Sequence, residues 1–202
     1  REAAVPGRRS RAMTTRPAVF LKRWLKDPRG IGAIAPSSRQ LGKAMASLIP
    51  PSSHGPIIEL GGGTGAITRT LLESGIAPER LVVVERDEHL HEVLSKSLPA
   101  IRVVRGDATA LGQLLRPLGI SHASAVVSGL PLLNMPKQVR HLIVVESFGL
   151  LESGAPFIQF TYGLTSPIPR QEFGLTGTVK RRVLNNLPPA SVWVYRRAAT
   201  RS

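Results

Sequence analysis

Five short apolar runs alternate with helix-type segments along the middle of the chain, and this alternation restricts the possible folds more than any other feature of the sequence. Apolar runs of this length are typical of strands that are covered on both faces. They span 57–60, 81–85, 101–105, 122–128 and 155–161. Strands that alternate with helices form a parallel sheet. We therefore predict an α/β fold with a doubly wound, Rossmann-like sheet that is mostly parallel.

Two segments between these runs carry clear helix signals. Residues 87–98 have an apolar face, and Glu92 precedes Lys96 by one helical turn, where the two charges can pair. The apolar face comprises Leu90, Val93, Leu94 and Leu98. Residues 136–151 open with Pro136, a favoured residue at a helix start. Both helices are expected to pack against the sheet.

The end of the chain departs from this alternation. Two strand-type runs, 177–184 and 191–197, are joined by the turn sequence NNLPPA, with no helix between them. Consecutive strands with so short a connection pair in an antiparallel way. We predict an antiparallel hairpin at the C-terminal end of the sheet.

The beginning of the chain is basic and has two parts. Residues 1–16 lack periodicity and are expected to form a flexible arm. Residues 17–202 are expected to form a single domain, in which 17–49 supply two helices and 50–202 supply the core. The first helix, 17–27, has apolar and basic residues on different faces, the pattern of an amphipathic segment.

Basic residues strongly outnumber acidic ones. The chain of 202 residues has 27 Lys and Arg against 13 Asp and Glu, a net charge of +14. Residues 1–29 alone contain nine basic and two acidic residues, a net charge of +7. A second basic cluster ends the chain, after Glu172. This distribution predicts an acidic partner, either nucleic acid or an anionic lipid surface.

Residue types that are missing or isolated exclude several kinds of site. The chain has no Cys, which excludes disulfides and thiolate metal sites. His89 and His91 lie two residues apart on one expected helix and therefore point to different faces, so no metal site is expected. No apolar run approaches the ~18 residues of a membrane span. We therefore expect a cytoplasmic protein, or one that is peripheral to a membrane.

A glycine-rich turn follows the first expected strand, in the sequence IIELGGGTG. Glycine is favoured where the backbone has positive φ or where a ligand approaches it closely. Backbone N–H groups of this turn, together with the start of the next helix, can hold a nucleotide-like ligand. The residues concerned are Gly61, Gly62, Gly63, Thr64 and Gly65. The spacing also matches the dinucleotide fingerprint, so the turn alone leaves NAD open.

Three acidic residues near the ends of the first three strands narrow the choice of ligand. Glu85 ends the second strand, where a carboxylate can accept both ribose hydroxyls of an adenosine. Asp107 follows the third strand and is expected near an adenine amino group. Glu59 immediately precedes the glycine turn. A buried carboxylate suits a sulfonium or ammonium and not a pyrophosphate, which favours S-adenosylmethionine over NAD.

With these residues assembled, the pattern resembles a known superfamily. The stretch Glu59–Gly65, then Glu85, then Gly106–Ala108 resembles the first three motifs of class I S-adenosylmethionine-dependent methyltransferases. The terminal hairpin is similar to the antiparallel end of that fold. The resemblance implies further cofactor contacts from Arg86, Ala108 and Ser128, and S-adenosylhomocysteine as product.

Three longer stretches resemble a narrower family, the bacterial phospholipid N-methyltransferases. They read FLKRWLKDPRGIGAIAPSSRQLGKAM, ELGGGTGAIT and SGLPLLNMP, and the resemblance runs from about Val19 to Arg197. It implies methylation of phosphatidylethanolamine and its methylated intermediates toward phosphatidylcholine, at the inner face of the cytoplasmic membrane. Ornithine lipid as the acceptor stays open.

The same superfamily contains rRNA adenine dimethyltransferases, which would suit a basic chain. Their fourth motif holds the base between an Asn or Asp and an aromatic residue, whereas this chain has Ser128-Gly-Leu-Pro-Leu132 at the equivalent place. Both the amide and the stacking ring are missing, which argues against nucleic acid as the acceptor.

A lipid amine must be neutral and in line with the methyl group when it attacks, so positioning can supply most of the catalysis. Backbone carbonyls around Leu130 and Pro131 are expected to orient the amine. Tyr162, just after the fifth strand, is expected to accept a hydrogen bond from it or to place its ring against the growing ammonium.

The remaining expected contacts concern the phosphate and the membrane. Arg170 and Lys180 are candidates for the phosphate, because the loop around Arg170 is expected near the mouth of the site. Asn134 either reaches a glycerol or phosphate oxygen or caps the helix that opens at Pro136. Helix 17–27 has the composition of an in-plane membrane anchor. Its contact residues are expected to be Phe20, Lys22, Arg23, Trp24 and Lys26.

Overall fold

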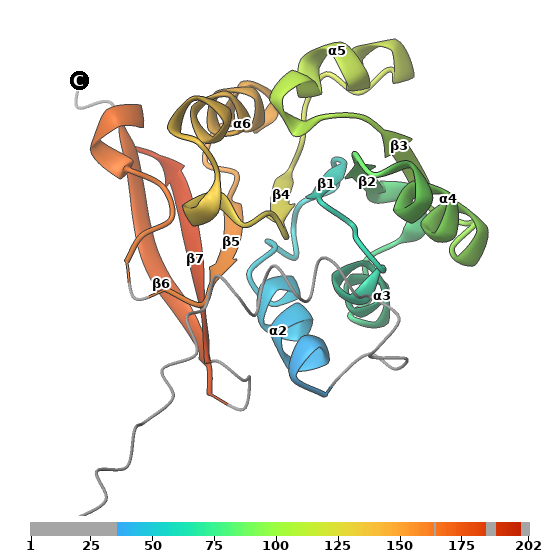
Figure 1. Ribbon diagram of the computed structural model, residues 1–202, viewed down its shortest axis with the longest axis horizontal. Coiled ribbons are helices and arrows are strands. Elements are labelled where there is room, and N and C mark those ends of the chain that lie inside the picture. Colours follow the sequence, from blue (N-terminus) through green and yellow to red (C-terminus); the bar gives the residue numbers. More distant parts are fainter. Residues whose placement is uncertain (1–35, 164, 185–188, 199–202) are drawn as a thin grey trace, which may run out of the picture.

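A seven-stranded sheet with helices on both sides forms the part of the chain described by the computed structural model, residues 36–163, 165–184 and 189–198 (Figure 1). The strands are β1 (Ile57–Leu60), β2 (Leu81–Glu85), β3 (Arg102–Arg105), β4 (Ala125–Ser128), β5 (Phe157–Thr161), β6 (Leu175–Val183) and β7 (Ala190–Arg197). The α-helices are α2 (Pro36–Ala46), α3 (Ala66–Glu73), α4 (Glu88–Ser97), α5 (Leu111–Leu115) and α6 (Lys137–Leu150). Short 3-10 helices span Pro78–Arg80, Ala108–Ala110, Arg116–Leu118, Leu132–Asn134 and Arg170–Phe173. The expected arm 1–16 and helix 17–27 lie outside the described residues.

The sheet confirms the predicted topology. Its order is β3-β2-β1-β4-β5-β7-β6, and β1 to β5 are all parallel. The hairpin formed by β6 and β7 pairs antiparallel and adds to the sheet through β5. The strand order reverses between β1 and β4, so a ligand site is expected there, at the carboxyl ends of the strands. We call the side of the sheet on which β1 to β5 end the carboxyl edge, and the opposite side the amino edge.

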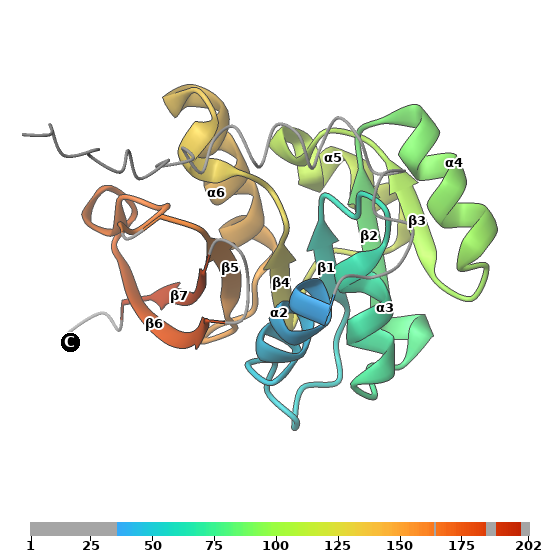
Figure 2. The same cartoon turned by 60° about the horizontal axis from the view of Figure 1, so that its bottom comes forward.

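Both faces of the sheet are covered, which explains the apolar runs in the sequence. Ile57 and Ile58 of β1 point to opposite faces and are both fully buried. On one face the core is formed with α2, α3 and α4, and on the other with α5 and α6 (Figure 2). Because each buried strand contacts two layers, both of its faces are apolar.

Two details of the predicted core are wrong, and both concern the edge of the sheet formed by β3. Arg102 and Arg105 of β3 are exposed, because β3 is an edge strand with a neighbour on one side only. Arg105 pairs with Glu88 at 2.7 Å, and charged residues on an edge hinder pairing with other chains. In α4 only Leu94 is fully buried, whereas Val93 is 39% exposed, because the helix lies over this edge. The predicted pair of Glu92 with Lys96 is present, at 3.3 Å.

Candidate functional site

The glycine turn between β1 and α3 has the backbone that its sequence predicts. Gly61, Gly63 and Gly65 have φ of 75°, 55° and 81°, a conformation that other residues adopt only with strain. A side chain at Gly62 would come within 2.4 Å of Val83, so this glycine allows close packing on β2. A side chain at Gly63 would meet no atom within 4 Å among the described residues. Gly63 therefore borders open space in which a ligand could lie against the backbone.

Glu85, at the end of β2, is tied to this turn through its carboxylate. Its Oε2 accepts a hydrogen bond from the Gly63 N–H at 2.8 Å, and its Oε1 accepts one from the Asp87 N–H at 2.9 Å. The side chain is buried at 8% exposure. Each carboxylate oxygen can accept a second donor, so the ribose hydroxyls of an adenosine could still bind here.

Glu59, in the middle of β1, is a fully buried carboxyl group. Thr68 of α3 donates a hydrogen bond to its Oε1 at 3.0 Å, and its Oε2 has no partner within the described part of the chain. Burial raises the pKa of Glu59 from 4.5 to about 8, with a smaller contribution from the nearby charge of Glu85. An acceptor oxygen without a donor, at the base of the glycine turn, fits a cationic group of a ligand.

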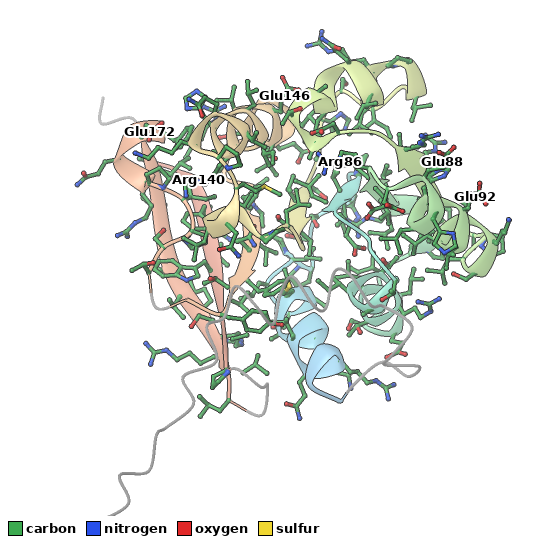
Figure 3. All side chains as sticks on the ribbon, viewed as in Figure 1. Arg86, Glu88, Glu92, Arg140, Glu146 and Glu172 are labelled. Carbon is green, nitrogen blue, oxygen red and sulfur yellow. The ribbon has the colours of Figure 1, made fainter. Side chains whose placement is uncertain are left out.

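Asp107, after β3, is held in place by its neighbours. Its Oδ1 accepts hydrogen bonds from the backbone N–H and the hydroxyl of Thr109, both at 2.9 Å. These bonds, chiefly the one from the Thr109 backbone, lower the pKa of Asp107. Arg86, labelled at the end of β2 in Figure 3, is exposed and reaches Asp107 Oδ2 at 3.4 Å. Ala108 follows and is buried. Glu85 and Asp107, which end neighbouring strands, therefore lie on the same edge of the sheet as the glycine turn.

The turn after β4 lies directly against the glycine turn. Ser128 is fully buried, and its hydroxyl accepts a hydrogen bond from the Leu130 N–H at 3.3 Å. Gly129 donates its N–H to the Leu60 carbonyl at 2.8 Å. The side chain of Leu130 is so close to Gly61 that a Cβ on that glycine would come within 2.6 Å of it. The structure thus brings together the predicted cofactor turn and the predicted acceptor turn.

A pocket of about 250 Å³ opens beside Leu130, between residues 130–134 and 160–163. Tyr162 and Asn134 line it, together with mainly apolar side chains and Pro131. The ring of Tyr162 packs edge-on against Phe160, with 5.5 Å between the ring centres. Asn134 does not cap α6, whose N-cap is Pro136 without a side-chain hydrogen bond. The cap interpretation of Asn134 is therefore wrong, and its contact with a substrate stays a prediction.

Arg170 lies away from this pocket. Its Nη1 donates to the Gly177 carbonyl at 2.8 Å, and its guanidinium lies 6.0 Å from the ring centre of Trp193. Gly177 is opposite Tyr195, which is opposite Phe157 at the start of β5. The loop must reach the amino edge to start the antiparallel β6, so Arg170 is not at the mouth of the site as expected. Lys180 is exposed in the second half of β6, nearer the carboxyl edge.

Gln159 of β5 is a site residue that the sequence interpretation missed. It is 1% exposed, and its Nε2 donates to the carbonyls of Leu130 and Phe160 at 2.9 and 2.7 Å. Because both partners are carbonyl acceptors, the NH₂ group of the side chain must face them. Oε1 then has no partner among the described residues. The Leu132 N–H also donates to the Leu130 carbonyl, at 2.9 Å, so this carbonyl already accepts two bonds. A glutamine inside an otherwise apolar strand was the signal available in the sequence.

Within the described ranges, two further kinds of feature are absent. No group of three or more His, Asp or Glu residues is arranged to hold a metal ion there. No helix in those ranges has the length and apolar content needed to cross a bilayer.

Comparisons with known proteins identify related methyltransferases. No protein-family model matches the chain. Ornithine lipid N-methyltransferase of Singulisphaera acidiphila is 35% identical over 147 residues, which cover 71% of this chain and 76% of that protein. Ribosomal RNA small subunit methyltransferase A of Anaeromyxobacter dehalogenans is 28% identical and covers 74% of this chain but 56% of that protein.

Solved structures show the same fold at low sequence identity. A TehB-like SAM-dependent methyltransferase from Corynebacterium glutamicum superposes with a TM-score of 0.59 at 15% identity, over 90% of this chain and 98% of that one. TrmN from Thermus thermophilus gives a TM-score of 0.60 at 17% identity, over 88% of this chain and 53% of that one. The cofactor is S-adenosylmethionine. The chain belongs to the class I S-adenosylmethionine-dependent methyltransferases, in the family of the ornithine lipid N-methyltransferase.

Proposed function

We propose that the chain is a lipid N-methyltransferase that methylates the primary amine of a membrane aminolipid. The observation that carries this proposal is the mainly apolar pocket beside Leu130, which adjoins the glycine turn and presents Tyr162 and Asn134. A small, mainly apolar pocket suits an aliphatic amine. No pair of amide and stacked ring, as a nucleobase would need, occurs at Ser128–Leu132.

Cofactor binding rests on the residues that end β1, β2 and β3. When bound, S-adenosylmethionine supplies an electrophilic methyl group, and S-adenosylhomocysteine remains. Glu85 accepts hydrogen bonds from the ribose hydroxyls. Asp107, with Arg86 and Ala108, borders the adenine. Glu59 presents Oε2, which has no partner among the described residues, to a cationic part of the ligand. The remaining contacts with the cofactor come from the backbone of the glycine turn, including Thr64, and from the buried Ser128.

Transfer to the amine depends on orientation and exclusion of water. Gln159 and the Leu132 N–H hold the Leu130 carbonyl, and with it the turn that forms one wall of the pocket. Pro131 restricts the same turn. Tyr162 lines the pocket and either accepts a hydrogen bond from the neutral amine or places its ring against the ammonium that develops as the nitrogen attacks. The extra proton of the methylated amine then leaves to solvent.

Two aminolipids fit this chemistry. The sequence resemblance points to phosphatidylethanolamine, and the relative from Singulisphaera acidiphila is named for ornithine lipid. Both present a primary amine and an anionic group, so Lys180 and Asn134 are candidates to contact the anion. The protein acts as a peripheral protein on the inner face of the cytoplasmic membrane, with residues 17–27, which the sequence predicts to be an amphipathic helix, as anchor. The single-domain organisation over 17–202 belongs to the same proposal.

The test is methyl transfer from labelled S-adenosylmethionine by the full chain. Separate reactions contain vesicles with phosphatidylethanolamine, vesicles with ornithine lipid, and total RNA, and the label is counted in the organic and aqueous phases. We expect label in lipid, and mass spectrometry of the product identifies the acceptor and the number of methyl groups. Label in RNA and none in lipid would overturn the proposal and favour an rRNA methyltransferase.

A further inference from the structure

Apart from Val183, the end of β6 and the residue after it are exposed, and three of these residues are basic. We propose that Arg181, Arg182 and Leu184, together with Lys180, form a docking surface for an anionic membrane that holds the acceptor pocket against the bilayer. The inference rests on the proposed function, because it concerns how the same site reaches a lipid amine. We call these four residues the hairpin surface.

The strand register places the hairpin surface on the carboxyl edge. Thr161, the last residue of β5, is opposite Ser191 near the start of β7. Ser191 is in turn opposite Arg182, and Ala190 is opposite Val183, the last residue of β6. The connected ends of β6 and β7 therefore lie beside the end of β5, on the side to which β5 points in Figure 1. Tyr162 and Gly163, which line the pocket, directly follow that end.

A bulge in β6 explains why three basic side chains in a row are exposed. The register with β7 shifts between Val179 and Arg181, so Lys180 is the extra residue. Strict alternation would turn at least one of three consecutive side chains into the core. With the bulge, Lys180, Arg181 and Arg182 are all exposed, and Val183 is buried again at 8%.

The charges of the hairpin surface are not neutralised locally. None of its three basic side chains forms an ion pair with a carboxylate in the described part of the chain. Arg181 donates a hydrogen bond from Nη1 to the Lys180 carbonyl at 3.0 Å, and its other guanidinium N–H groups are available to a lipid headgroup. Helix α2 packs beside β6 and carries an exposed Lys43. The uncompensated positive charge matches an anionic lipid surface.

Apolar side chains on the same edge favour a membrane over RNA as the partner. Leu184 is 73% exposed and follows the arginines directly. Leu133, on the rim of the pocket, is 37% exposed. Leucines beside basic residues suit the boundary between headgroups and acyl chains. A surface that binds single-stranded RNA usually offers aromatic rings for stacking, and the described residues of the hairpin surface have none.

The experiment measures binding of the full chain to vesicles by sedimentation. Wild type is compared with Arg181→Gln/Arg182→Gln/Leu184→Ser on vesicles with and without an anionic lipid. A surface control, Arg116→Gln/Leu118→Ser, changes one exposed Arg and one exposed Leu on the 3-10 helix that ends near the amino edge. Because each basic contact contributes ~1 kcal/mol near an anionic surface, we expect the hairpin variant to bind roughly tenfold or more weakly. The control is expected to bind as wild type does.

The outcomes separate this inference from the proposed function. Equal melting temperatures, and equal methylation of a short-chain aminolipid that is monomeric in solution, show that the hairpin variant is folded and active. Unchanged vesicle binding by that variant would overturn the docking surface and leave the enzyme assignment intact. No vesicle binding and no lipid methylation by wild type would overturn the proposed function itself. RNA binding that is lost in the hairpin variant, without vesicle binding by wild type, would reassign the surface to nucleic acid.

Discussion

Thr68 of α3 donates a hydrogen bond to Glu59 of β1 at 3.0 Å, and this bond links the helix after the glycine turn to the strand before it. It satisfies one oxygen of a carboxyl group that has no access to solvent, whereas the other oxygen has no partner in the described residues. Burial raises the pKa of this group from 4.5 to about 8. In the ligand-free protein at pH 7, Glu59 therefore carries a proton for most of the time.

The first prediction concerns cofactor affinity. A cationic ligand near Glu59 favours the ionised carboxyl, so binding at pH below about 8 releases a proton. We expect the affinity for S-adenosylmethionine to rise with pH between 6 and 8, by up to about tenfold per pH unit. Calorimetry in buffers with different ionisation enthalpies measures the released proton. In Glu59→Gln the proton release from this site disappears, and the titration of the ligand's own amine remains as the baseline. Identical pH slopes for the two proteins would contradict the assignment of Glu59.

The second prediction concerns folding stability. Between pH 4.5 and about 8 the folded protein holds a proton on Glu59 that the unfolded chain has lost. Stability therefore falls as pH rises through this range and levels off above it, by at most ~1.4 kcal/mol for each unit of the pKa difference. Glu59→Gln keeps an acceptor for Thr68 and lacks the ionisation. In urea unfolding, the free energy of unfolding of the variant relative to wild type is expected to be higher at pH 9 than at pH 5. The same difference at both pH values would be inconsistent with a raised pKa of Glu59.

The third prediction separates binding from backbone strain in the glycine turn. Ala at Gly63 adds a methyl group to open space, at φ 55°, beside the Glu85 carboxylate. Gly75→Ala is the matched control, because Gly75 has φ 90°, also faces open space, and lies after α3 away from the site. Both substitutions are expected to lower the free energy of unfolding by ~1–2 kcal/mol. Only Gly63→Ala is expected to weaken S-adenosylmethionine binding, by about tenfold or more. Equal binding by both variants would place the ligand elsewhere.

Most of the fold could be predicted from the sequence, because it depends on local patterns. The runs 57–60 and 81–85 match β1 and β2 residue for residue, and the NNLPPA turn identified the hairpin. Strand ends were less accurate: β4 begins at Ala125, three residues later than expected. Before it, Ala123 is buried and forms an isolated parallel bridge with Leu151, outside the strand itself.

What could not be predicted depends on contacts between distant segments. Arg170 was expected near the mouth of the site, but the antiparallel direction of β6 takes its loop back toward the amino edge, where the Gly177 carbonyl accepts a hydrogen bond from it. Gln159 was missed because its partner, the Leu130 carbonyl, is 29 residues away in sequence. The burial that raises the pKa of Glu59 likewise depends on α2 and α3 covering the sheet.

The fourth prediction tests how Tyr162 acts. Its ring packs against Phe160 and its side chain lines the pocket. If the ring face stabilises the developing ammonium, Tyr162→Phe keeps most of the activity and Tyr162→Ala loses about tenfold to a hundredfold in kcat, consistent with ~1–2 kcal/mol for a desolvated cation–π contact and some lost orientation. If the hydroxyl orients the amine, kcat of Tyr162→Phe falls nearly as far as kcat of Tyr162→Ala. Steady-state rates with an aminolipid in detergent distinguish the two, and full activity of Tyr162→Ala would remove the residue from the site.

The last prediction is that Gln159 positions the acceptor turn without touching the cofactor. Its Nε2 bridges the Leu130 and Phe160 carbonyls, which belong to the two walls of the pocket. Gln159→Leu removes both bonds and also the buried Oε1 that has no partner in the described residues, so the loss of stability is expected to be small. The Leu130 turn then has only the Leu132 N–H to hold its carbonyl, and we expect kcat to fall by about tenfold because misorientation acts on the transition state. The dissociation constant of S-adenosylmethionine is expected to stay within about twofold, since the glycine turn is intact.

Gln171→Leu, which changes an exposed glutamine in a 3-10 helix, serves as control and is expected to match wild type. A parallel loss of cofactor affinity in Gln159→Leu would mean that the residue supports the whole carboxyl edge and not the acceptor turn.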